Sequence, residues 1–144
     1  GQGYDDGLVA ALAVCDMLDR APDKSLADLK KALPKTWQSP TMAPHCPDEK
    51  KYEVVGRVVE HYQKLKAEGG TVAGQKIADL ITVNGIRVVL EDGTWGLVRA
   101  SSNKPELVVV VESPTSEANM RAIFADIDGV LSKMPEVGEY NQKI

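Results

Sequence analysis

The chain has 144 residues, of which 43% are hydrophobic and 26% charged, a balance typical of a folded globular protein rather than a disordered one. Its 21 acidic and 17 basic side chains give a formal net charge of -4, which excludes a molecule-wide positive field that would attract nucleic acid or an anionic membrane. The apolar runs are far shorter than the roughly 18 residues that a membrane span needs, so we expect a cytoplasmic protein with neither nucleic acid nor a membrane as partner.

The first 36 residues carry two helical patterns. Apolar residues recur at three- and four-residue spacing from Leu8 to Leu18, directly after Asp5 and Asp6. This pattern predicts an amphipathic helix with a carboxylate cap at its start. Ser25 and Asp28 have the spacing of a capping box and predict a second, short helix.

A proline-rich stretch separates these helices from the rest of the chain. Four prolines and no helical period occur from Pro34 to Pro47, which predicts a linker that contributes an edge strand near Thr41 to Cys46. A hinge around Trp37 to Pro44 would let a domain close over a ligand. We therefore place a domain boundary between residues 36 and 37, so that the two parts are residues 1–36 and 37–144.

A long helix opens the second part. Its apolar stripe runs from Tyr52 to Leu65, Asp48 stands ahead of it as the expected cap, and Gly69 with Gly70 closes it. A stripe of this width predicts that the helix packs on a sheet.

Antiparallel strands and a last helix follow. Asn84-Gly85 and Asp92-Gly93 lie between short β-rich runs and predict two hairpins. The β-branched run from Leu107 to Val111 is typical of a central strand, and a final helix begins near Ser113 to Thr115. The predicted fold class is α+β, with an antiparallel sheet of about four to five strands and two helices on one face.

The segment from Arg99 to Pro105 has the residue types of an anion site. It lies between two predicted strands and is too long and too polar for a simple hairpin turn. Hydroxyls, side-chain amides and consecutive loop amides donate hydrogen bonds to an anion, and an arginine fork matches two phosphate oxygens. The candidate phosphate ligands are Arg99, Ser101, Ser102, Asn103 and Lys104. On chemistry alone, an ordinary solvated loop remains an equally open interpretation.

The run VNGIRVVLEDGTWGLVRASSNKP, from Val83 to Pro105, resembles the fourth domain of the α-D-phosphohexomutases. That family has a DGVRV-like strand, a DGWGLVR strand and a phosphate-binding loop of the form R-x-S-N/G-T-x-P. The opening GYDDGLVAAL, residues 3–12, resembles the end of the family's third domain. The resemblance implies that residues 1–36 are the helical carboxy-terminal remnant of a third, α/β domain. It implies equally that residues 37–144 are the carboxy-terminal, TBP-like phosphate-binding domain.

The resemblance implies a role in phosphate binding for individual residues of the loop. Arg99 and Ser101 match the family's phosphate-gripping arginine and first serine. Ser102 and Asn103 stand where asparagine or glycine and then threonine are usual, so the hydrogen-bond set departs from the family pattern. Lys104 is an additional cation beside the loop.

The resemblance also implies an activity for a longer parent protein. Such phosphomannomutases/phosphoglucomutases are isomerases that interconvert the 1- and 6-phosphates of mannose or glucose through a bisphosphorylated sugar, with a phosphoserine and Mg²⁺. Neither a TASHNP-like serine loop, a DGDxDR-like metal loop nor a GEMSG-like sugar loop occurs in this sequence. We therefore expect no catalytic or metal-binding residue here and a piece that is inactive alone. Its expected partners are a sugar phosphate and the parent's remaining domains.

Two other function classes stay open. A non-catalytic α+β module that binds a ligand or a protein fits the same order of elements. The run FADIDGVL, with Asp126 and Asp128 two apart, matches the nucleophile signature of haloacid-dehalogenase phosphatases. The period around these aspartates is helical, which favours a solvated helix face.

The remaining chemically suggestive residues have structural interpretations. The glycines near Lys76 lack the order of a phosphate loop, and His45 and His61 lack zinc-type spacing. Cys15 and Cys46 are expected to be free, buried thiols, because a chain of this size needs no disulfide.

Overall fold

The computed structural model describes residues 6–144, and their contacts divide the chain into two units. The first unit ends at Lys35 and the second runs from Thr36 to Ile144. No helix among the described residues is long and apolar enough to cross a membrane.

The first unit contains helices α1 (Gly7–Asp19) and α2 (Leu26–Lys31). Asp6 caps α1 as predicted, since its Oδ1 accepts from the amides of Leu8 and Val9 at 2.9 and 3.1 Å. Asp5 lies outside the described residues. The capping box of α2 is confirmed: the Asp28 amide donates to Ser25 Oγ, and the Ser25 amide donates to Asp28 Oδ2.

The apolar side of α1 is uncovered within its own unit. No described residue of α1 or α2 is buried, and Leu8 is 71% exposed. Cys15 shares this exposure, so the prediction that both thiols are buried is wrong for Cys15 and confirmed for Cys46. Both cysteines are free, as expected. Two short helices do not provide enough apolar surface to bury each other's faces.

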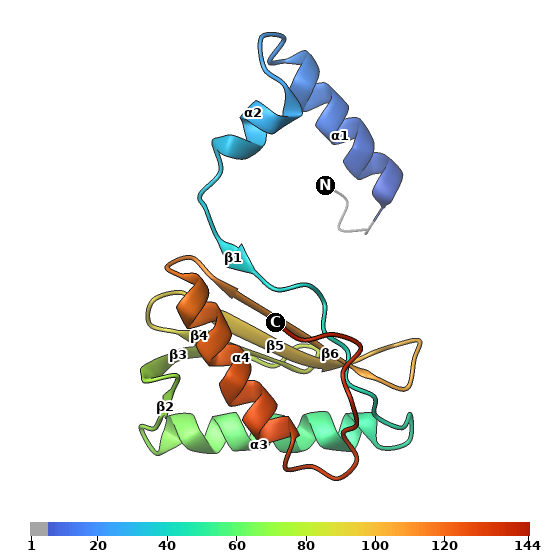
Figure 1. Ribbon diagram of the computed structural model, residues 1–144. Helices are drawn as coiled ribbons and strands as arrows, with labels where there is room; N and C mark the ends of the chain where they lie inside the picture. The colour runs from blue at the N-terminus through green and yellow to red at the C-terminus, as the bar shows by residue number, and fades with distance from the viewer. Residues whose placement is uncertain (1–5) are drawn as a thin grey trace. The chain divides into compact units, whose positions relative to one another are not determined.

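The second unit is an antiparallel sheet covered by two long helices, which confirms the α+β class (Figure 1). The strand order is β1-β6-β5-β4-β3-β2. The strands are β1 (Trp37–Gln38), β2 (Thr71–Val72), β3 (Gln75–Ile81), β4 (Ile86–Leu90), β5 (Trp95–Ala100) and β6 (Leu107–Ser113), and the helices are α3 (Lys51–Ala67) and α4 (Glu117–Leu131). There are six strands rather than four or five because a two-residue strand lies at each edge, too short to show a periodic pattern.

Helices α3 and α4 lie on one face of the sheet. Val88, Gly96 and Val111 are paired across β4, β5 and β6, and a Cβ added at Gly96 would meet side chains of α4. The fully buried Tyr62 of α3 donates from its hydroxyl to Asp126 Oδ1 of α4 at 2.9 Å. Burial and the neighbouring carboxylate raise the pKa of Tyr62, which keeps it neutral as a donor. This hydrogen bond joins the two helices above the sheet.

The proline-rich stretch is not a free linker. Met42 exchanges two backbone hydrogen bonds with Val109, and the Leu107 amide donates to Pro44 O at 2.9 Å. Together with β1, these bonds attach the segment from residue 37 to residue 45 along the edge of β6. The edge pairing near residues 41–46 is therefore confirmed. The hinge around Trp37 to Pro44 stays a prediction, and bending there would have to break this pairing.

The first turn of α3 differs from the expected cap. Lys50 occupies the N-cap position without a side-chain cap, and Asp48 instead accepts a hydrogen bond from Lys51. Tyr52, assigned to the apolar stripe, is 67% exposed, while its neighbour Val54 is fully buried. The helix face that meets the sheet is thus rotated at its start relative to the predicted stripe.

Asp92, in the turn between β4 and β5, ties the sheet to the start of α4. Its carboxylate accepts from the Thr94 backbone amide and hydroxyl, the Thr115 hydroxyl and the Asn119 side-chain Nδ2, at distances of 2.7–2.9 Å. Partial burial alone would raise the pKa of Asp92, but these hydrogen bonds together hold it well below its usual range.

Replacing Asp92 by Asn should lower the free energy of unfolding by about 1–3 kcal/mol at neutral pH, because buried donors lose acceptors. Since the folded pKa is depressed, the contribution of Asp92 is fully present well above the ordinary pKa of 3.8 and decreases progressively as the pH falls from there toward the folded value. Urea unfolding between pH 7 and pH 2 measures both effects. Glu91→Gln, at the exposed neighbouring carboxylate, is the matched control. Equal stability of the two variants at neutral pH would contradict this role of Asp92.

Candidate functional site

The segment predicted to bind an anion is a loop between β5 and β6. Its base is closed by a hydrogen bond from the Ser101 amide to Glu106 O at 3.0 Å. The Cys46 amide donates to Pro105 O at 2.9 Å and attaches the loop to the segment that precedes α3. The loop therefore projects from the sheet on the side where α3 begins (Figure 1).

Arg99 lies near the end of β5, on the face of the sheet opposite the helices. Its neighbours Val98 and Ala100 are buried under the helices, and side chains alternate along a strand. The guanidinium is half-buried, and its Nη1 donates to Ala100 O at 3.1 Å. Among residues 6–144, no ion pair within 4.0 Å joins Arg99 to a carboxylate. Its other donors are therefore available to an anion.

The loop itself presents a run of unused donors. Ser101 is only 8% exposed, yet its hydroxyl makes no hydrogen bond with the part of the chain that the structure describes. The same holds within residues 6–144 for the side chains of Ser102 and Asn103. Nor do the backbone amides of Ser102, Asn103 and Lys104 donate to any acceptor there. Donors of this number close together match the oxygens of a phosphate group.

Lys104 adds a positive charge, but few contacts hold its side chain in place. Its side chain is 70% exposed, and its Nζ lies 3.9 Å from Glu106 Oε1, the long separation of a weak surface pair. The five candidate ligands thus belong to one strand end and the loop that follows it. Lys104 is the least constrained of them.

Two residues beside the loop were not identified from the sequence. Lys51 is buried at the start of α3, where its Nζ donates to Lys104 O at 3.2 Å. Gly85 has a φ of +85°, and a Cβ there would meet Val98 O and the backbone of Arg99. The Asn-Gly turn was a visible signal for Gly85, whereas a lysine next to Lys50 at a helix start resembles an ordinary surface residue.

The other chemically suggestive residues have structural partners. Asp126 and Asp128 lie within α4, as the helical period predicts, and both are half-buried rather than fully solvated. Asp126 accepts from Tyr62, and Asp128 pairs with Lys143 at 2.9 Å. A dehalogenase-type nucleophile ends a strand, so this arrangement does not support that chemistry.

The described residues contain no cluster of metal-ligating side chains. Within residues 6–144, no three His, Cys, Asp or Glu side chains are grouped as a metal ion requires. We therefore assign no step of a reaction to a metal held by this chain.

Comparison with known proteins gives a family match over the second unit. The model described as "Phosphoglucomutase/phosphomannomutase, C-terminal domain" matches residues 45–130, which include all five candidate ligands. Three similar proteins are a phosphopentomutase of Thermococcus kodakarensis, a probable phosphoglucosamine mutase of Methanothermobacter thermautotrophicus and a phosphomannomutase/phosphoglucomutase of Pseudomonas syringae. Their identities are 38%, 32% and 32%, over 64%, 78% and 92% of this chain.

These matches cover 19%, 22% and 25% of the three proteins, so the chain spans about a fifth to a quarter of their length. A crystal structure of a phosphoglucomutase/phosphomannomutase family protein from Burkholderia thailandensis is similar in fold. Its TM-score is 0.60 at 24% identity, over 92% of this chain and 25% of that one.

Gly85→Ala should lower the free energy of unfolding by about 1–3 kcal/mol and displace the backbone at Arg99, because the new Cβ meets Val98 O in a strained conformation. The control is Gly74→Ala, which has a similar φ of +78° but no atom within 4 Å of the added Cβ. Urea unfolding and the amide resonances of residues 98–100 measure the difference. If both variants lose the same stability and neither moves those resonances, the contact between Gly85 and the Arg99 strand has no such role.

Proposed function

Since the chain belongs to the phosphoglucomutase/phosphomannomutase family, we propose that it is the carboxy-terminal part of an α-D-phosphohexomutase whose loop binds the non-reacting phosphate of a sugar phosphate. The phosphate ligands are Arg99, Ser101, Ser102, Asn103 and Lys104. The parent enzyme is then an isomerase that interconverts a hexose 1-phosphate and a hexose 6-phosphate.

One observation carries the assignment of the loop. The Arg99 guanidinium has no carboxylate partner among residues 6–144 and donates to Ala100 O, directly before a loop in which three successive amides donate to no described acceptor. Unpaired donors next to one another are unfavourable unless water or a ligand accepts their hydrogen bonds. A dianionic phosphate accepts several of them at once, which supports this ligand over a neutral one.

Such a site would hold the substrate in place and would not itself take part in making or breaking a bond. Phosphoryl transfer depends mainly on holding the reacting groups in line and on stabilising charge. A bisphosphorylated sugar has to turn round between the two half-reactions, so the loop must accept either of its phosphates. A site that binds the phosphate and makes no contact with the sugar ring meets this requirement. The names of the similar proteins, which include mutases of different sugar phosphates, are compatible with sugar selection elsewhere in the enzyme.

The first unit fits the end of a preceding domain. The match to the Pseudomonas syringae protein covers 92% of this chain and so includes most of residues 1–35. The exposed apolar residues of α1, such as Leu8 and Leu12, then pack against the rest of that third domain. The phosphoserine and the magnesium site belong to the parent's other domains, where the metal stabilises charge during phosphoryl transfer. The present chain is inactive alone.

The proposal competes with a non-catalytic α+β module that binds a ligand or a protein. The two proposals differ in which amide resonances should shift when phosphate is added. A phosphate site confined to the loop responds at its own amides, whereas a general binding module has no preference for these positions.

Titration of the chain with inorganic phosphate should shift the amide resonances of residues 100–104 together, with one dissociation constant. Chloride at matched ionic strength is the control, since it lacks the geometry of a tetrahedral dianion. Shifts centred on another part of the second unit, or equal shifts with chloride, would overturn the assignment of the loop.

In the intact parent enzyme, Arg99→Ala should lower kcat/KM by about 10- to 150-fold, because charge-assisted hydrogen bonds are worth roughly 1.5–3 kcal/mol each. Lys104→Ala should have a smaller effect, because its side chain is exposed and only loosely placed. Steady-state kinetics with a hexose 1-phosphate measures both. Near-normal kinetics of the Arg99 variant would count against the proposed role.

A further inference from the structure

Lys51 is the one buried charged residue in the part of the chain that the structure describes. Its side chain is 5% exposed, although it belongs to the first turn of a helix, where lysines ordinarily extend into solvent. Removing an ammonium group from water is unfavourable by several kcal/mol unless it is paired and hydrogen-bonded. The burial of Lys51 therefore requires a structural explanation.

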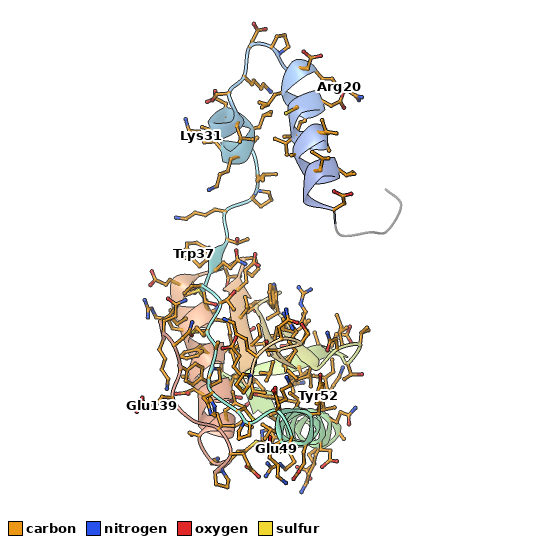
Figure 2. The ribbon with its side chains drawn as sticks, turned by 90° about the vertical axis from the view of Figure 1, so that its right-hand side faces the viewer. Arg20, Lys31, Trp37, Glu49, Tyr52 and Glu139 are labelled. Carbon is orange, nitrogen blue, oxygen red and sulfur yellow. The ribbon has the colours of Figure 1, made fainter. Side chains whose placement is uncertain are left out.

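The contacts of Lys51 lead from α3 to the candidate phosphate loop. Its Nζ donates to Asp48 Oδ1 at 2.6 Å and to the backbone carbonyl of Lys104 at 3.2 Å. The same carbonyl also accepts from the Glu106 amide at 2.8 Å. Figure 2 views α3 end-on from its first turn, with Glu49 and Tyr52 labelled at that end of the helix.

The neighbouring Lys50 shows that an ion pair with a carboxylate three residues away does not require burial of the lysine. Lys50 pairs with Glu53 at 3.0 Å with the same three-residue spacing, but both side chains are about half exposed. An ion pair within one helical turn thus forms without burial. What distinguishes Lys51 is its second acceptor, the carbonyl of a loop residue 53 positions away in the sequence.

We propose that Lys51 is a positioning residue of the phosphate loop: its ammonium group holds the Lys104 carbonyl toward α3 and so fixes the loop with its amides free. This inference rests on the proposed function of the loop. Lys104 is the last of the three residues whose amides have no acceptor among residues 6–144. A hydrogen bond to its carbonyl therefore restricts the backbone from Ser102 to Lys104. A loop ordered before binding loses less conformational entropy when the anion arrives.

The test compares Lys51→Met with Lys50→Met in the 144-residue chain. Methionine keeps an unbranched apolar side chain, one atom shorter than lysine, and removes the charge and the donors. The affinity for inorganic phosphate, read from the amide resonances of residues 100–104, should fall about tenfold or more for Lys51→Met and less than twofold for Lys50→Met. Lys51→Arg, which restores a charged donor, should recover part of the loss.

A second measurement uses the unaltered chain and does not depend on how a variant folds. The ammonium resonance of Lys51, observed by 15N-resolved NMR, should shift during the phosphate titration with the same dissociation constant as the loop amides. A lysine with a purely structural role in α3 would not respond. An unchanged ammonium resonance, or equal phosphate affinity of the Lys51→Met and Lys50→Met variants, would overturn the role of Lys51.

The two proposals fail in different ways. If the unaltered chain binds phosphate at the loop and Lys51→Met binds it equally well, only the role of Lys51 is wrong. If phosphate shifts no loop amide in the unaltered chain, the proposed function is wrong, and the role of Lys51 falls with it.

Discussion

The arrangement of the second unit depends on a sheet that is covered by helices on one face only. Helices α3 and α4 cover one face, so alternate residues of β5 are buried beneath them. Because side chains alternate along a strand, Arg99 is forced onto the other face at the end of β5. Its guanidinium therefore arrives at the loop without a carboxylate partner among residues 6–144. The same alternation places Ala100, with its small side chain, beneath the helices.

The loop is held mainly from its inner side. The Ser101 amide closes its base, the Cys46 amide binds the Pro105 carbonyl, and Lys51 binds the Lys104 carbonyl. Each hydrogen bond contributes on the order of 1 kcal/mol net, and together they engage carbonyls rather than the outer amides. The amides of Ser102, Asn103 and Lys104 are left without an acceptor among residues 6–144, which suits an anion.

The elements that the sequence predicted well are those specified by local chemistry. Asn84-Gly85 and Asp92-Gly93 form the expected hairpins because both glycines adopt the positive φ that these turns need. The capping box at Ser25 is equally local. The five candidate ligands were identified because their residue types and their place between two strands are visible in the sequence, although their role as phosphate ligands stays a proposal.

The misses depend on contacts between distant segments. The pairing of Trp37 and Gln38 with β6 is too short to show a period and lies between prolines, so the sequence predicted only a linker there. The burial of Lys51 depends on a carbonyl far along the chain, which no helical pattern encodes. Cys15 was expected to be buried because its helix face is apolar, but that face has no cover within residues 6–35.

The most direct test of the central claim is a crystal structure of the intact parent enzyme with a bisphosphorylated sugar. The account predicts one phosphate with oxygens about 2.7–3.0 Å from the Arg99 guanidinium and from the amides of Ser102 and Asn103. It predicts contact with the phosphate and not with the sugar hydroxyls. A phosphate bound elsewhere, with Arg99 paired to a carboxylate of another domain, would contradict it.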